Sequence, residues 1–307
     1  MNQTQLRQLQ NNVEIIGTLK SKDLEVKTSK NGKNFMSGRM VVQSMADNKI
    51  NEHVIEIFTM QSSKLFKGLE TVKDEYKTID ADGLENADRI KVNGTLKLKE
   101  YCSSQDNLIQ YNEVRGMIFS RLDKNDLQKD KALASIETVV DGFAEKLNED
   151  QSPTGEFLLN GFTVGWANEV IELKGAFVCS KLSQPFMNLY QPGSTGRLSF
   201  KLSSFAEVGE EEVVAEAGFG TSVDIEDTFK PSTKYASSIE IIGGDKPFSN
   251  TKGYTPVEIE SAKQVRALKS SEVLNKNSAI KANTGFGLGA PVQSPTEILN
   301  NDNMPDF

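Results

Sequence analysis

Hydrophobic and polar residues alternate in short stretches along the first part of the chain. One stretch begins at Val13, a second follows the Asn31-Gly32 pair, and a third covers His53–Thr59. Strict alternation is typical of a strand with one buried face, and an Asn-Gly pair between two such runs is typical of a hairpin turn. The pattern therefore predicts three consecutive strands. In the second strand, the residues expected to point inward are Met36, Gly38, Met40 and Val42.

The pattern changes after the third strand and then returns. Ser63–Tyr76 carries apolar residues three or four positions apart, which predicts a helix. Alternation resumes over Ile90–Lys99 and again over Tyr111–Phe119. Five short strands with a helix between the third and the fourth is the order of an OB-fold, a small, partly open barrel that commonly binds oligonucleotides.

A similar order of elements repeats in the next part of the chain, which indicates a second copy of the same fold. Glu207–Asp227 is acidic and long for a strand connection, so we expect it to be a large loop. The expected strands are Ile136–Leu147, Glu156–Val164, Val170–Val178, Leu198–Leu202 and Ser238–Ile242, with a helix at Ser180–Tyr190. The predicted fold class is mainly β: two tandem five-stranded OB-fold barrels, each with a short helix between strands three and four.

After Gly243 the composition changes. Pro256–Val273 can form an amphipathic helix, and the chain beyond it is rich in Asn, Ser, Gly and Pro, which predicts disorder. The expected organisation is a flexible N-terminus at 1–10, a DNA-binding barrel at 11–121, a linker at 122–133, an acidic barrel at 134–243, a connecting segment at 244–269 and a disordered tail at 270–307.

Charge modifies this picture. The chain has 307 residues and a formal net charge of −8, and a negative total argues against a polyanion partner. The charge is uneven, however: residues 11–121 carry 17 basic and 16 acidic side chains, whereas residues 134–243 carry 7 and 17. The second barrel is therefore expected to repel a phosphate backbone, while the first can still bind one.

Composition also excludes several classes of function. His53 is the only histidine, and Cys102 and Cys179 are the only cysteines, so we expect neither a zinc site nor a disulfide framework. No apolar run approaches the ~20 residues of a membrane helix and no signal peptide opens the chain, which predicts a cytoplasmic protein with no membrane contact. No set of nucleophile, base and orienting residue is visible. We therefore expect no catalysis, no cofactor and no metal.

The strand Lys91–Tyr101 is the most informative stretch for function. Its outward residues include Lys97, Lys99 and Tyr101. Cations that follow a phosphate backbone, interleaved with an aromatic ring on which a base stacks, are what single-strand binding requires. Neighbouring strands would extend this surface with Phe35, Arg39, Phe58, Tyr111 and Arg115. The alternative is that the lysines only keep an exposed strand soluble and that the phenylalanines belong to the core.

Residues 12–119 resemble the DNA-binding domain of bacterial and phage single-stranded DNA-binding proteins. Val92–Tyr101 is similar to that family's Gly-x-Leu-basic-x-basic-x-aromatic strand, and Tyr111–Val114 to its following Tyr-x-x-Glu-Val. The Asn31-Gly32-Lys33 turn and His53–Phe58 resemble its second and third strands. The resemblance covers about a third of the chain and implies that basic residues contact phosphate while aromatic residues stack bases. The resemblance assigns DNA contact to Lys97, Lys99, Tyr101 and Phe58. Together with the residues that would extend or support the same surface, the candidate DNA-binding residues are Lys33, Phe35, Arg39, Phe58, Lys97, Lys99, Tyr101, Tyr111 and Arg115.

Three positions depart from the family's pattern. Glu52 lies where many members have a stacking Trp, Gly38 lies where an apolar side chain is usual, and Glu100 is acidic in a usually basic strand. We expect these departures to lower affinity more than to change the fold. In the second barrel, Trp166 lies between two expected strands and could stack a base, but we expect it to pack over one end of its own barrel.

The last residues are Met304, Pro305, Asp306 and Phe307. They resemble the acidic terminal peptide, closing in Pro-Phe, with which bacterial members dock replication and repair enzymes. The resemblance implies that replication or recombination proteins bind this tail. The alternative is that Phe is simply the residue at which the chain ends.

These features predict a non-catalytic, sequence-independent single-stranded DNA-binding protein of the phage type. It would coat and protect exposed strands in DNA replication, recombination and repair, in the host cytoplasm if it is phage-encoded. The other interpretation is an OB-fold adaptor or assembly protein whose barrels bind proteins. The sequence leaves open whether the chain forms a homo-oligomer, whether the second barrel contacts DNA, and whether DNA is preferred over RNA.

Overall fold

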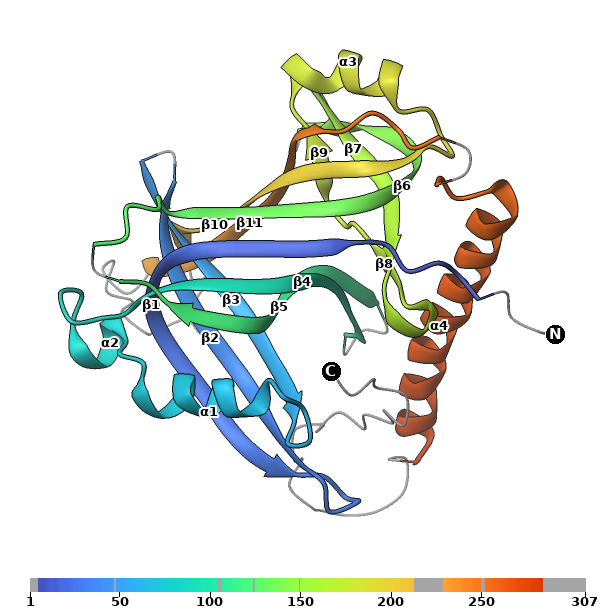
Figure 1. Ribbon diagram of the computed structural model, residues 1–307. Helices are drawn as coiled ribbons and strands as arrows, with labels where there is room; N and C mark the ends of the chain where they lie inside the picture. Colours follow the sequence, from blue (N-terminus) through green and yellow to red (C-terminus); the bar gives the residue numbers. More distant parts are fainter. Residues whose placement is uncertain are drawn as a thin grey trace, which may run out of the picture.

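The computed structural model describes residues 5–283, with gaps at 47, 104–106, 124, 149, 213–228 and 250–251 (Figure 1). The five strands of the first half pair in a closed ring: β1 with β2, β2 with β3, β3 with β5, β5 with β4, and β4 with β1. Only the β3–β5 pair is parallel within this ring. The strands are β1 (Asn11–Thr28), β2 (Asn34–Ala46), β3 (Lys49–Met60), β4 (Arg89–Cys102) and β5 (Leu108–Arg121). The prediction of a mainly β chain with a closed five-stranded barrel is confirmed.

Two helices lie between the third and fourth strands of this barrel. Helix α1 (Phe66–Glu75) buries Phe66, Leu69 and Val72, the residues whose spacing predicts a helix. A single turn, α2 (Ile79–Asp82), follows, and the Thr78 hydroxyl accepts a hydrogen bond from the Ala81 backbone N–H at its start. The packed side of α1 therefore follows directly from the sequence.

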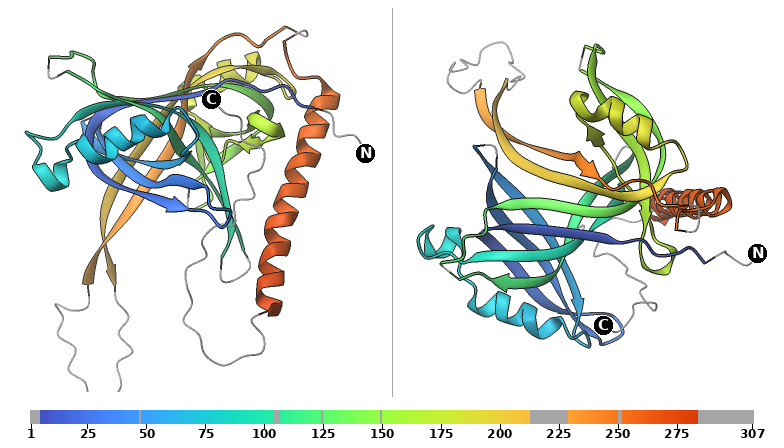
Figure 2. Two further views of the ribbon diagram at one scale, coloured as in Figure 1. Left: turned by 60° about the horizontal axis from the view of Figure 1, so that its bottom comes forward. Right: turned by 45° about the horizontal axis from the view of Figure 1, so that its top comes forward.

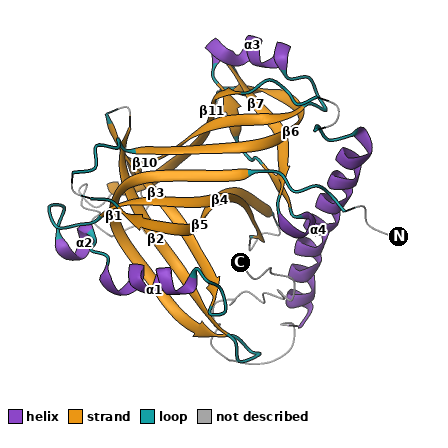
Figure 3. Cartoon of the chain, in the orientation of Figure 1, coloured by secondary structure: helices purple, strands orange, loops and turns teal. Residues whose placement is uncertain are grey.

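The strands of the second half form another ring, in which β6 pairs with β7, β7 with β9, β9 with β11, β11 with β10, and β10 with β6. The β9–β11 pair is parallel. Helix α3 (Ser180–Leu189) follows β9 and lies near β7 and β9 (Figures 1 and 3). The strands are β6 (Lys131–Leu147), β7 (Pro153–Val164), β8 (Val170–Glu172), β9 (Ala176–Val178), β10 (Thr195–Glu212) and β11 (Phe229–Gly244).

Several boundaries in the second ring differ from the expected ones. Strand β6 begins at Lys131, inside the segment expected to be a linker, because it pairs with β1 as well as with its own ring. Strand β10 continues to Glu212, into the stretch expected to be an acidic loop, and pairs there with an equally extended β11. This long two-stranded ribbon extends away from the ring (Figure 2).

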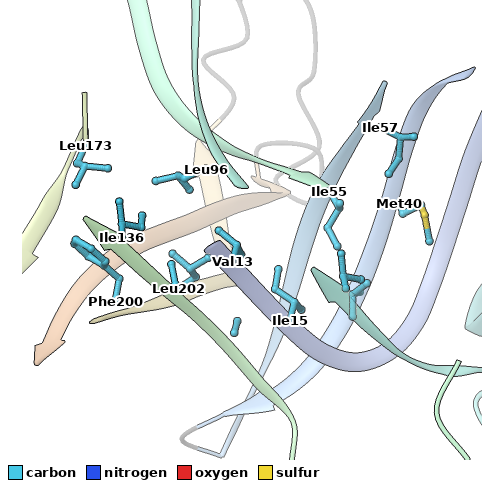
Figure 4. Packing of buried hydrophobic residues seen from close by; sticks show 14 of the residues in the cluster. Val13, Ile15, Met40, Ile55, Ile57, Leu96, Ile136, Leu173, Phe200 and Leu202 are labelled. Atoms are coloured by element: carbon cyan, nitrogen blue, oxygen red, sulfur yellow. The ribbon is translucent and has the colours of Figure 1, made fainter. Parts of the chain in front are cut away.

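The two rings share one core. Val13 and Ile15 on β1 pair with β4 on one side and with β6 on the other, so their side chains meet residues of both rings. Figure 4 shows these side chains in one cluster with Ile136 and Phe200 of the second ring, and all four are at most 2% exposed. Because one cluster of buried apolar side chains spans both rings, its burial stabilises them together.

Helix α4 (Pro256–Asn283) is longer than expected and includes residues 270–283, which the composition predicts to be disordered. Its first turn carries a capping box, in which Thr255 and Glu258 exchange hydrogen bonds between side chains and backbone N–H groups. The helix lies along the outside of the molecule (Figures 1 and 2). The tail residues 284–307, with the expected docking peptide, lie outside the described residues.

The segment before β1 is also ordered by packing. The composition of residues 1–10 predicts a flexible end, yet Leu6 and Leu9 are buried, and the Leu9 backbone N–H donates to the Val164 carbonyl (2.8 Å). They share a small apolar cluster with Tyr254 and Ala262. In the described ranges, no helix is both long and apolar enough to cross a membrane.

The single histidine belongs to this folded interior. His53 is 5% exposed, and its Nε2 lies 2.9 Å from the Ser44 hydroxyl oxygen. Burial lowers the pKa of His53 from 6.5 to about 4. Between these two values the unfolded chain binds a proton that the folded chain does not, so the free energy of unfolding falls as the pH falls.

We expect His53 to remove about 3 kcal/mol from the free energy of unfolding as the pH drops from 6.5 to about 4. His53→Gln keeps a polar partner for Ser44 but does not titrate, so its stability should depend less steeply on pH over this range. Urea unfolding at each pH measures the free energy of unfolding of both proteins. The difference between the two isolates His53, because the carboxylates titrate alike in both. Equal pH dependence in the two proteins would refute this role of His53.

Candidate nucleic-acid interface

The outward face of the first barrel over β2, β3, β5 and β4 carries most of the candidate DNA-contacting residues. Every second side chain of a strand points to the same face, and the strand register aligns these side chains across neighbouring strands. Arg39 is opposite Glu56 in the β2–β3 pair, Glu56 is opposite Arg115 in the β3–β5 pair, and Lys99 is opposite Tyr111 in the β4–β5 pair. Residues far apart in the chain thus share one continuous surface. We call it the β2–β5 face, and its candidate residues are Phe35, Arg39, Phe58, Lys99, Tyr101, Tyr111 and Arg115.

Two aromatic pairs lie on this face. The rings of Phe35 and Phe58 have centroids 5.3 Å apart and are tilted by 36°, and the Arg115 guanidinium carbon lies 5.8 Å from the Phe58 centroid. The rings of Tyr101 and Tyr111 lie 6.4 Å apart, edge to face. The tyrosines are 47% and 42% exposed, and the phenylalanines are half-buried, so neither pair belongs to the fully buried core.

The arginines on the face are matched by carboxylates. Arg39 Nε donates to Glu56 Oε1 at 2.5 Å, and this hydrogen bond raises the pKa of Arg39. Arg115 Nη2 lies 3.9 Å from Glu113 Oε1, while its buried Nε has no hydrogen-bond partner among the residues that the structure describes. Burial, followed by the charge of Glu113, raises the pKa of Tyr111. The face is therefore mixed in charge rather than uniformly basic.

The lysines are placed differently from one another. Lys97 is paired with Glu169, which belongs to the turn between β7 and β8 of the second ring. Lys99 lies opposite Tyr111, and Lys33 is exposed on the hairpin turn between β1 and β2. The structure thus groups Lys99 with the tyrosines, uses Lys97 in a contact between the rings, and leaves Lys33 at the tip of the hairpin.

The three residues expected to lower affinity, Glu52, Glu100 and Gly38, each have a defined place in the structure. Glu52 Oε1 pairs with Lys20 Nζ at 2.5 Å, so this position carries an ion pair. Glu100 is paired with Arg266 of α4, and both side chains are almost fully buried. Gly38 has φ +152° and lies against β1 with no space for a Cβ atom.

Residues that link the two rings could not be found from local patterns. The side-chain amide of Asn112 donates to the Glu172 carbonyl (2.8 Å) and accepts from the Lys174 backbone N–H (2.6 Å). Arg266 donates to both Glu100 and Glu172. Burial alone would raise the pKa of Glu172, but the Lys174 ammonium and the Arg266 guanidinium outweigh it, so that pKa is lowered.

The described part of the chain offers no group of three or more His, Cys, Asp or Glu side chains that could hold a metal ion. The acidic residues Glu210–Glu212 lie in the part of β10 whose side chains the structure does not describe.

Comparison with known proteins gave one family model and several solved structures. The model of a family described as YorF matches residues 10–278. No curated protein matches the chain. Two crystal structures of the single-stranded DNA binding protein from Thermus aquaticus align with the chain. The wild type covers 82% of this chain and 99% of its own, at 11% identity and a TM-score of 0.46. A deletion mutant covers 81% of this chain and 98% of its own, at 12% identity and a TM-score of 0.44. The mitochondrial single-stranded DNA binding protein Rim1 from S. cerevisiae aligns with 39% of this chain and 98% of its own, at 10% identity and a TM-score of 0.26.

Proposed function

The chain belongs to the YorF family, and we propose that its first barrel binds single-stranded DNA on the β2–β5 face. The observation that carries the proposal is the placement of two aromatic pairs, Phe35 with Phe58 and Tyr101 with Tyr111, on one partly exposed face of a closed barrel. Aromatic rings at this degree of exposure offer flat surfaces on which unpaired bases stack, and Arg115 and Lys99 lie beside them to contact phosphate.

The charge pattern of the face limits how tightly it binds. A phosphate that approaches Arg39 or Arg115 meets Glu56 or Glu113 as well, so part of the attraction is cancelled. Stacking, worth about 1–3 kcal/mol per base, then supplies a larger share of the affinity than it does on a purely basic face. We therefore expect moderate affinity with a shallow dependence on salt, since few counterions are released.

We further propose a fold for the two rings, a biological role for the protein and a partner for its tail, as the sequence suggests. The two rings would be tandem OB-fold barrels, with the second, net −10 over residues 134–243, not following the DNA backbone. The protein would coat exposed strands without catalysing a reaction or carrying a cofactor, as in replication or recombination. Its terminal residues Met304–Phe307 would dock replication or recombination proteins. A phage-encoded protein of this kind would act in the host cytoplasm.

The test is a titration of the full chain with a labelled oligo-dT strand, followed by fluorescence anisotropy over a salt series. We expect Phe58→Leu and Tyr101→Ala each to weaken binding about 5- to 150-fold, because each removes a stacking ring. Leu84→Ala, which truncates an exposed apolar side chain in the loop between α2 and β4, is the control and should bind like the parent. No binding of the parent at low salt, or equal binding by all variants, would refute the proposal.

One observation favours the adaptor function instead. Three of the candidate cations, Arg39, Lys97 and Arg115, are already paired with carboxylates, as in a protein-facing surface of mixed charge. An adaptor would show no measurable oligo-dT binding, and its interaction with double-stranded DNA and RNA would be equally absent. Parallel titrations with single-stranded DNA, double-stranded DNA and RNA therefore separate the two functions.

A further inference from the structure

The turn between β7 and β8 presents the only tryptophan of the chain. Trp166 is 49% exposed and begins a short 3-10 turn, η1 (Trp166–Asn168). Ala167 and Asn168 have φ values of 53° and 60°, a left-handed conformation that is strained for a residue such as alanine. Two backbone hydrogen bonds hold the turn, from Gly165 N–H to the Glu169 carbonyl (2.8 Å) and from Glu169 N–H to the Trp166 carbonyl (3.1 Å). The fold thus maintains a strained turn that leaves the indole partly exposed, instead of packing it over the barrel end.

The indole borders an open cavity. It has a volume of about 420 Å³ and is lined by the Trp166 turn, by residues 5–8 of the N-terminal segment and by Glu258 of α4. This volume lies within the ~300–1,000 Å³ range of small-molecule sites. The walls are well anchored, because the Leu6 backbone N–H donates to the Asn168 side-chain oxygen (2.9 Å) and Leu6 itself is buried.

The lining suits a neutral ring better than an anion. Among the described residues that line it, the one cation, Arg7, donates to the Lys252 carbonyl (2.5 Å) and lies over the Tyr254 ring. The one anion among them, Glu258, accepts hydrogen bonds in the cap of α4. The two charges cancel, and both are already engaged. The other polar side chains of this lining are amides: Asn168, whose oxygen accepts from Leu6, and Gln5 and Gln8, whose amides can offer both donors and acceptors to a planar edge.

One ion pair links the Trp166 turn, which lines the cavity, to a strand of the β2–β5 face. Glu169, three residues after Trp166, is paired with Lys97 on β4, so the turn is docked against the strand that carries Lys99 and Tyr101. A nucleic-acid strand that follows β4 past Lys99 would therefore meet this turn. A nucleobase also matches the lining, because it is a neutral planar ring with donors and acceptors on its edge.

We propose that the Trp166 turn is a second base-binding site, in which one unpaired base of the strand on β4 enters the cavity and stacks on the indole. The amide side chains contact the edge of the base, and its phosphate stays outside, toward Lys99. This inference rests on the proposed function, since it requires that the same strand occupy the β2–β5 face.

The single tryptophan makes a direct test possible without any variant. Oligo-dT binding is followed on the full chain in two ways at once, by anisotropy of a label on the DNA and by the intrinsic emission of Trp166. A base stacked on the indole should quench the emission with the same midpoint as the anisotropy change. Binding by anisotropy with no change in emission would overturn the inference and leave the proposed function intact, whereas no binding by anisotropy would overturn both.

Variants test whether the contact contributes affinity. We expect Trp166→Ala to weaken oligo-dT binding about 5- to 150-fold and Trp166→Phe, which retains a stacking ring, to restore most of it. Leu127→Ala, at an exposed apolar position, is the control for truncation of a surface side chain. Unchanged affinity of Trp166→Ala, or a loss that Trp166→Phe does not reverse, would overturn the inference. Circular dichroism and thermal melting of each variant confirm that the fold is retained.

Discussion

Replacement of Arg266 by alanine is expected to lower the free energy of unfolding by about 3–5 kcal/mol. The Arg266 side chain is 6% exposed and donates to both oxygens of Glu100, itself 5% exposed, and to Glu172. Glu100 is also held by the side-chain amide of Gln110 (2.7 Å). Without the guanidinium, Glu100 would be a buried carboxylate with no countercharge, and the large cost is the desolvation of that charge rather than the loss of attraction alone.

Equilibrium unfolding in urea measures this effect, and a second helix position provides the control. Lys263 lies on the same helix and pairs with Asp141, but their side chains are 46% and 41% exposed, so Lys263→Ala should cost at most about 1 kcal/mol. The double variant Arg266→Met/Glu100→Gln, which removes both charges, should recover much of the stability. If Arg266→Ala cost no more than Lys263→Ala, α4 would not be locked to the rings by this ion pair.

Arg266 also joins the two rings, because Glu100 lies on β4 and Glu172 on β8. We therefore expect Arg266→Ala to broaden the unfolding transition or to split it in two, as the rings lose part of their coupling. The shared core of Val13, Ile15, Ile136 and Phe200 remains, so we do not expect the rings to separate in the native state.

The second large effect is expected at Gly38. Its φ of +152° is unfavourable for any residue with a side chain, and a Cβ atom there would lie 1.9 Å from the carbonyl oxygen of Asp23. That oxygen belongs to the backbone of β1, which is paired with β2 on either side of this point and cannot move aside cheaply. Gly38→Ala should therefore destabilise the protein by about 3–5 kcal/mol, the sum of the conformational strain and the steric overlap.

The control is a glycine with free space. Gly68 is the third residue of α1, and no atom from outside its own helical turn lies within 4 Å of the position that an added methyl group would take. Gly68→Ala should therefore raise the free energy of unfolding by about 0.5–1 kcal/mol through helix propensity. Thermal and urea unfolding of the two variants would show shifts of opposite sign. A Gly38→Ala protein as stable as the parent would mean that β1 and β2 can separate at this point without cost.

Much of the first barrel could be predicted from its sequence. The alternation in β2 places Met36, Met40 and Val42 inward, and all three are 0% exposed. The same argument holds for Ile55 and Ile57 on β3. These predictions succeed because the two faces of a strand differ in solvent exposure and the repeat that encodes them spans only a few residues.

The predictions fail where stability comes from partners far along the chain. The composition of the N-terminal segment and of residues 270–283 indicates disorder, yet Leu6 and Leu9 pack into a cluster with Ala262, and α4 continues to Asn283. The order of the N-terminal segment follows from burial of Leu6 and Leu9 against the second ring and α4, which no short window of sequence contains. Residues 270–275 of α4 are mostly exposed, so the end of this helix has no such explanation in the described side chains.

For the candidate interface, the sequence by itself determined which residues face outward on β4 and β5 and that cations and aromatic rings alternate there. The tertiary structure alone decided how these residues are used: it pairs Lys97 with Glu169, 72 residues away, and buries Glu100 against Arg266, 166 residues away. The physical reason is the distance along the sequence over which each property is determined. A strand's inward and outward positions are encoded by its nearest neighbours, whereas the charge that a lysine or glutamate finally presents depends on which distant segment the fold brings against it.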